Sequence, residues 1–69
     1  MKEYVTNNIA QLRKEKGITQ EEFAQAIAVS RQTVITIEKG NCIPSLLLGL
    51  KIAEFFHKSV EEVFVRQEK

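Results

Sequence analysis

The stretch from Thr19 to Gly40, TQEEFAQAIAVSRQTVITIEKG, predicts two short helices joined by a tight turn. Thr19 and Glu22 stand three residues apart, which is the spacing of a capping box that satisfies backbone donors where a helix starts. Ser30 suits the cap of the second helix, which leaves Ala28-Val29 as the turn. This pair of helices is the most informative feature of the chain.

Local start and stop signals predict three further helices around this pair. Gly17 should end a first helix, because glycine readily takes the left-handed conformation of the residue after a helix. Ser45 follows Pro44 and should start a fourth helix, and Ser59 with Glu62 makes another capping box ahead of a short fifth. We therefore expect an all-α domain. The residues expected to face its core are Ile9, Leu12, Phe23, Ala24, Ile27, Val34, Ile37, Leu46, Gly49, Ile52, Ala53 and Phe56.

Length and composition indicate one small domain over residues 1–69, with a core at 7–63 and short extensions at 1–6 and 64–69. A chain of this size buries about 60% of the surface that its unfolded form exposes. The single Cys42 excludes an internal disulfide, and no Cys/His cluster has zinc spacing, so we expect neither metal nor cofactor. No apolar run approaches about 18 residues and no signal peptide is evident, which favours a cytoplasmic protein without a membrane segment.

The outer side of the helix at Ser30–Lys39 carries side chains suited to reading DNA. Arg31 has a rigid fork that matches guanine O6 and N7, and Gln32 can make a bidentate pair with adenine. The methyls of Thr33 and Thr36 can touch a thymine methyl, and their hydroxyls can contact a phosphate. The net charge of only +1 adds weak support. A solvated polar helix face is the competing interpretation.

Five separated strings, LRKEKGITQEEFA, VSRQTV, IEKG, PSL and KIAEFF, occur in order across residues 7–63. In these strings the chain resembles the Cro/CI-type (lambda-repressor-like, XRE) family of prokaryotic helix-turn-helix transcription regulators. The resemblance implies a compact bundle of five helices whose second and third form the helix-turn-helix. It also implies a cytoplasmic homodimer, associated with the nucleoid when bound. Its partner would be a pseudo-palindromic operator in double-stranded DNA, with no small-molecule ligand evident.

Position by position, the resemblance implies that Arg31, Gln32 and Thr36 read base edges in the major groove. The residues it implies at the DNA backbone are Thr19, Gln20, Ser30, Thr33, Lys39 and Asn41, with Lys14 a weaker candidate. Arg13 and Glu38 match a pair that forms an internal salt bridge in this family. The alternative for that pair is two unrelated surface charges.

Two residues depart from the family pattern. Ala28 stands where the turn usually has glycine, and if this position needs a positive φ, alanine costs on the order of 1 kcal/mol. Gly49 replaces the usual alanine, which weakens the helix and would allow close packing.

Apolar residues beyond the core indicate a protein partner. At least one of Leu47, Leu48 and Leu50 should be exposed, since a helix can turn only some adjacent leucines inward. The candidates for a self-interface are Leu47, Leu48, Leu50, Phe64 and Val65. Tyr4-Val5 can also pair with Phe64-Val65 as short strands, within one chain or between chains. The alternative is a frayed tail that packs Phe64 on its own core.

Other functions compete with a repressor. An antitoxin, or a controller of a restriction–modification or phage operon, would use the same DNA-binding surface. A protein-interaction module would instead use the leucine-rich fourth helix. An enzyme is disfavoured because His57 has no Cys or acidic partner at catalytic spacing, and no Ser/His/Asp set, paired acids or phosphate-binding loop is present.

Overall fold

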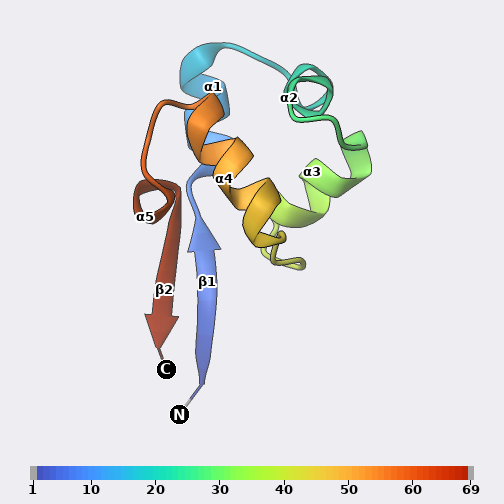
Figure 1. Cartoon of the computed structure of the whole chain (residues 1–69). Helices are drawn as coiled ribbons and strands as arrows, with labels where there is room; N and C mark the ends of the chain where they lie inside the picture. The colour runs from blue at the N-terminus through green and yellow to red at the C-terminus, as the bar shows by residue number, and fades with distance from the viewer. Residues whose placement is uncertain (1, 69) are drawn as a thin grey trace.

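The computed structural model describes residues 2–68, which form five helices and two strands (Figure 1). The elements in chain order are β1 (Glu3–Asn7), α1 (Ile9–Lys16), α2 (Gln20–Ala26), α3 (Arg31–Glu38), α4 (Leu46–Phe55), α5 (Val60–Val63) and β2 (Phe64–Glu68). None of the helices within residues 2–68 is long and apolar enough to cross a membrane.

Four of the helix starts are those that the sequence predicts, the starts of α2, α3, α4 and α5. Thr19 with Glu22 and Ser59 with Glu62 complete both capping boxes. Backbone and side-chain hydrogen bonds from Ser59 hold the pKa of Glu62 below its ordinary value of 4.5. This cap therefore stabilises the fold above that pH, and its contribution is lost as the pH falls through the lowered pKa. The two other predicted caps, whose hydroxyls accept a backbone N–H three residues on, are Ser30 and Ser45.

The core lies where the five helices meet. Its buried residues are Ile9, Phe23, Ala24, Ile27, Val34, Ile37, Ile52, Ala53, Phe56 and Val63. Phe23 contacts Phe55 and Phe56 with ring centroids 5.3 and 5.2 Å apart, so α2 is held against the end of α4. These are offset arrangements that aromatic rings favour.

The prediction of an all-α domain is incomplete, because the two ends of the chain form an antiparallel ribbon. The segments are those anticipated for strand pairing, and they pair within one chain, with Thr6 opposite Val65 and Tyr4 opposite Gln67. In Figure 1 the ribbon extends away from the helices, and the two ends of the chain lie side by side at its tip. These residues are about 60 positions apart, so their pairing requires the helices to bring α1 and α5 together. Local sequence patterns do not reveal that arrangement.

Among the leucines of α4, Leu46 differs from the prediction, whereas Leu47 and Leu50 are exposed as the prediction for this helix allows. The sequence predicts Leu46 on the inner side, but it is 76% exposed, with Leu47 71% and Leu50 50% exposed. Leu48 is half-buried and packs against the core, as does Phe64. The reason is helical geometry. The buried side of α4 is centred near Ile52, and at about 100° per residue Leu46 falls beyond its edge.

Two residues other than glycine adopt the left-handed conformation. Ala28, in the turn between α2 and α3, has φ 61°, and His57, after α4, has φ 56°. Ala28 therefore has the positive φ at which the family pattern calls for glycine. The side chain of alanine clashes with its own backbone there, which costs roughly 1–2 kcal/mol.

We expect Ala28→Gly to raise the free energy of unfolding by about 0.5–1 kcal/mol, because relief of the backbone clash exceeds the added chain entropy of the unfolded state. Urea unfolding followed by circular dichroism measures this change. Ala26→Gly is the matched control in the last turn of α2, and it should lower stability by about as much. A loss of stability in both variants would show that the conformation at Ala28 carries no strain.

Gly49 permits a second stabilising change. A Cβ built on this buried glycine would lie 3.8 Å from Cε2 of Phe64, which is ordinary van der Waals contact, so the packing of α4 on β2 does not require glycine. Gly49→Ala should raise the free energy of unfolding by roughly 0.5–1 kcal/mol through helix propensity. A lower thermal midpoint in the alanine variant would mean that Phe64 cannot accommodate the methyl.

Candidate nucleic-acid interface

The helix-turn-helix is a compact unit with one side in the core. α2 and α3 pack on each other, and the turn is closed by Val29 N–H donating to the carbonyl of Ala24 at 3.0 Å. On α3, Val34 and Ile37 are buried at 1% and 2% exposure. The start of α3 is capped by Ser30, whose hydroxyl accepts the backbone N–H of Thr33 in the first turn of the helix.

The predicted base-reading residues lie on the outer side of α3. Arg31 and Gln32 are exposed in its first turn, and Thr36 is half-buried one turn later. The Thr36 hydroxyl donates to the backbone carbonyl of Gln32 at 2.9 Å, and Gln32 Nε2 lies 3.4 Å from Thr36 Oγ1. The structure therefore brings Gln32 and Thr36 together, with Arg31 beside them in sequence.

The predicted backbone-contact residues fall at the helix ends. The hydroxyls of Thr19 and Ser30 each accept a backbone N–H as caps. Ser30 Oγ also lies 2.8 Å from Thr33 Oγ1, so one of these hydroxyls is engaged as donor to the other. Lys39 and Asn41 are exposed directly after α3. Lys14 is exposed on α1.

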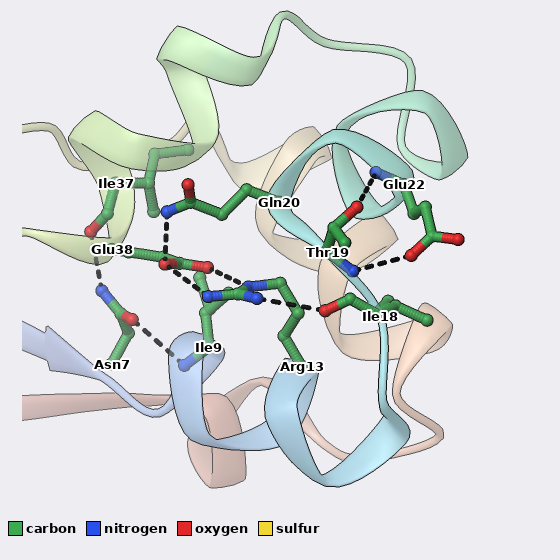
Figure 2. A network of polar contacts seen from close by, with 9 residues as sticks. All are labelled: Asn7, Ile9, Arg13, Ile18, Thr19, Gln20, Glu22, Ile37 and Glu38. Carbon is green, nitrogen blue, oxygen red and sulfur yellow. Dashed lines mark hydrogen bonds and ion pairs between the residues drawn. The ribbon is translucent and has the colours of Figure 1, made fainter.

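Gln20, the first residue of α2, points toward the end of α3 (Figure 2). Its Nε2 donates to Glu38 Oε1 at 3.1 Å. An amide nitrogen carries two hydrogens. One hydrogen of Gln20 therefore fixes the side chain against Glu38, and the other remains for an acceptor outside the protein.

Arg13 and Glu38 form a largely buried ion pair at the centre of this network (Figure 2). Arg13 Nε donates to Glu38 Oε2 at 2.8 Å and its NH2 group donates to Oε1 at 3.3 Å. The third donor group of Arg13 reaches the carbonyl of Ile18 at 3.1 Å. The two side chains are 11% and 8% exposed. This bidentate pair joins α1 to α3 and neutralises a carboxylate near the outer face of α3.

Sequence reasoning missed the part played by Asn7. Its Nδ2 donates to the carbonyl of Ile37 at 2.9 Å, and its Oδ1 accepts the backbone N–H of Ile9 at 3.1 Å (Figure 2). Asn7 thereby ties the end of β1 to the last turn of α3. The sequence shows an asparagine ahead of a helix, which could have indicated a cap. It does not show that the partner of this asparagine lies 30 residues away.

Residues outside this surface show no assembled reactive site. No group of three or more His, Cys, Asp or Glu side chains in residues 2–68 could hold a metal ion. His57 and Cys42 are exposed in connections on either side of α4.

We expect Arg13→Met to lower the free energy of unfolding by about 3–5 kcal/mol, because it leaves the Glu38 carboxylate buried without its counter-charge. The exposed pair of Arg66 and Glu3, with a similar 2.7 Å distance, is the matched control. Arg66→Met should change stability by less than about 1 kcal/mol. Urea unfolding at neutral pH measures both.

Replacing both Arg13 and Glu38 shows how much of the lost stability comes from burying an unpaired charge and how much from the lost contact between α1 and α3. Arg13→Met combined with Glu38→Met should recover part of the loss, because it removes both buried charges. If Arg13→Met and Arg66→Met lowered the free energy of unfolding equally, the buried pair would not stabilise the fold more than the exposed one.

Comparison with known proteins agrees with this geometry. A family model described as helix-turn-helix matches residues 9–63. The uncharacterised HTH-type transcriptional regulator YgzD of Bacillus subtilis is 44% identical over 63 residues, which cover 91% of this chain and 96% of that protein. The cryptic phage CTXphi transcriptional repressor RstR of Vibrio cholerae is 34% identical over 58 residues, covering 84% of this chain and 52% of that protein.

The fold agrees as well. The crystal structure of a transcriptional regulator from Listeria innocua matches with a TM-score of 0.74 and 29% identity, covering 80% of this chain and 51% of that chain. These relatives are transcription regulators and not enzymes. The chain therefore belongs to the XRE-type helix-turn-helix family of DNA-binding transcription regulators, as its resemblance to Cro/CI-type proteins predicted.

Proposed function

We propose that this chain is a cytoplasmic repressor that binds a pseudo-palindromic operator as a homodimer, with α3 in the major groove. The division of α3 into two sides carries the proposal. Val34 and Ile37 are buried, while Arg31 and Gln32 are exposed in the first turn. A helix supported in this way can enter a groove about 12 Å wide without losing its core contacts. One of the relatives, RstR, is a transcriptional repressor, and this supports repression as the function.

Arg31, Gln32 and Thr36 read the bases in this proposal. The guanidinium fork of Arg31 fits guanine O6 and N7. Contact with Thr36 occupies one amide hydrogen of Gln32, so the amide oxygen and the second hydrogen remain for adenine N6 and N7. The Thr36 methyl offers an apolar contact for thymine.

Contacts to the DNA backbone fix the register of α3. Gln20 offers its second amide hydrogen to a phosphate while Glu38 holds the first. Lys39 and Asn41 are exposed directly after the end of α3 and offer further donors to phosphates. Further hydrogen-bonding groups in the proposed set are the hydroxyls of Thr19, Ser30 and Thr33. These contacts position the protein and carry no sequence information of their own.

A homodimer would place two α3 helices on half-sites one helical turn apart, about 34–36 Å. The exposed leucines of α4 favour a second candidate function, a module that captures another protein. The two functions respond differently to substitution. If Arg31→Ala loses DNA binding, the result supports the operator-binding function. If the protein stops working in Leu47→Lys but not in Arg31→Ala, the result supports the module that captures another protein.

Selection from a random duplex pool, followed by titration of the winning sequence against salt, tests the proposal. We expect a pseudo-palindrome with half-sites about one turn apart and an affinity that falls steeply with salt. Arg31→Ala should weaken binding by about 1–3 kcal/mol and relax one base position. Lys39→Ala should weaken all sequences and lower the salt slope by about 1.

Lys58→Ala is the matched control for Lys39→Ala. Lys58 is exposed in the connection between α4 and α5, which lies across the bundle from α3 (Figure 1). Its removal should leave the salt slope unchanged. No enriched sequence, with only micromolar or weaker binding, would sink the proposal.

A further inference from the structure

Asn7 is held by hydrogen bonds at both ends of its side-chain amide. It is the last residue of β1, and it is half-buried. Its Nδ2 donates to the carbonyl of Ile37 at 2.9 Å, and its Oδ1 accepts the backbone N–H of Ile9 at 3.1 Å (Figure 2). Exchanging the two amide atoms would set a donor against the Ile9 N–H and an acceptor against the Ile37 carbonyl. Only the observed orientation satisfies both partners.

The carbonyl of Ile37 lies in the last turn of α3, shortly before Lys39. It also accepts the backbone N–H of Gly40 at 2.9 Å, which closes the turn that follows the helix. A carbonyl oxygen has two lone pairs, so the bonds from Asn7 and Gly40 can be made together. Asn7 therefore reaches the backbone at the point where Lys39 leaves the helix.

Asn7 is itself fixed by the pairing of the two chain ends. It lies opposite Phe64 in the β1–β2 ribbon, and the next backbone N–H, that of Asn8, donates to the carbonyl of Val63 at 2.9 Å. Val63 is buried in the core and Phe64 packs against it. The core thus supports the end of β1, and the end of β1 supports the end of α3.

The contact between β1 and α3 depends on this one bond. A hollow of about 300 Å³ lies between them, lined by residues 4–7 on one side and 38–40 on the other. Within residues 2–68, the bond from Asn7 to Ile37 is the one hydrogen bond that crosses from β1 to α3. Because the two elements are not packed together across the hollow, this bond sets how the end of α3 sits against the strand.

Asn7 acts on the helix in a different way from Arg13 and Gln20. Those two side chains hold the carboxylate of Glu38, which can adjust by rotation of its own side chain. The bond from Asn7 ends on the backbone of α3, where no such adjustment is available. It is therefore the more direct constraint on the path of the chain after the helix.

We infer that Asn7 is a positioning residue for DNA binding. Through the Ile37 carbonyl it holds the end of α3, so that Lys39 keeps its reach to a phosphate. The inference rests on the proposed function, in which Lys39 contacts the DNA backbone, and it makes that contact depend on the terminal ribbon. Asn7 itself contacts no DNA. Binding groups must be held within about 0.5 Å of their productive geometry by supporting hydrogen bonds of this kind.

Asn7→Ala and Asn8→Ala test the inference as a matched pair. Asn8 is exposed, and its Nδ2 donates to the carbonyl of Glu62 at 3.1 Å, so it makes the same kind of bond but to α5. Fluorescence anisotropy measures the affinity for the selected operator duplex, well below the thermal midpoint of each variant. We expect Asn7→Ala to weaken binding roughly threefold to tenfold, the effect of one weakened polar contact. Asn8→Ala should stay within about twofold of the wild type.

Salt dependence and a double substitution separate positioning from a general loss of folded protein. Asn7→Ala should lower the salt slope toward that of Lys39→Ala, because the weakened contact is to a phosphate. In the Lys39→Ala background, Asn7→Ala should cause little further loss of affinity, because the contact that it positions is already absent. A general loss of folded protein would instead multiply the two effects and leave the salt slope unchanged.

Asn7→Ser keeps the test valid if the alanine variant unfolds. The serine hydroxyl can still accept the N–H of Ile9, but serine is one bond shorter and loses the link to Ile37. Its thermal midpoint should lie closer to that of the wild type, and its DNA affinity should be as low as that of Asn7→Ala.

The outcomes distinguish failure of the inference from failure of the proposed function. Suppose Lys39→Ala lowers the salt slope while Asn7→Ala and Asn7→Ser bind like the wild type, or Asn8→Ala weakens binding as much as Asn7→Ala. The inference is then overturned and the proposed function stands. If no duplex is selected, or Lys39→Ala binds like the wild type, the proposed phosphate contact is rejected and the inference falls with it.

Discussion

The Glu38 carboxylate is the group on which the placement of the reading helix most depends. It receives two hydrogen bonds from Arg13 on α1 and one from Gln20 on α2, while it belongs to α3. A carboxylate that is 8% exposed is tolerated only because these donors replace its water. Three helices are thus joined at one charge, and the apolar core alone would leave their relative rotation less defined.

The backbone strain at Ala28 follows from the packing of α2 and α3 on either side of the turn. The turn is fixed from both sides, because Phe23, Ala24 and Ile27 are buried before it and Val34 and Ile37 after it. The backbone at Ala28 must then take a positive φ whatever residue occupies it. Core packing is worth more than the 1–2 kcal/mol that the conformation costs, so tertiary structure prevails over the local preference of alanine.

Features that depend on neighbours three or four residues apart could be predicted from the sequence. Capping boxes at Thr19 and Ser59 and the glycine stop at Gly17 are of this kind, as is the buried pattern of α3. The hydrogen bond from Asn7 to Ile37 and the exposure of Leu46 could not. For the ribbon, the sequence indicated the segments but left open whether they pair within one chain. The ribbon and the hydrogen bond from Asn7 depend on which elements become neighbours in space, and the exposure of Leu46 depends on which side of α4 is buried. The candidate DNA-reading residues came from the family resemblance together with side-chain chemistry, and their partners remain a prediction.

The net charge of +1 bears on the proposed homodimer. Non-specific attraction to DNA grows with the number of phosphates neutralised. The cations proposed to face DNA are Arg31 and Lys39, with Lys14 a weaker candidate. In the proposed homodimer, two copies of α3 would contact the operator at once. Linking two half-site contacts converts the second into an intramolecular event and multiplies affinity without new charges.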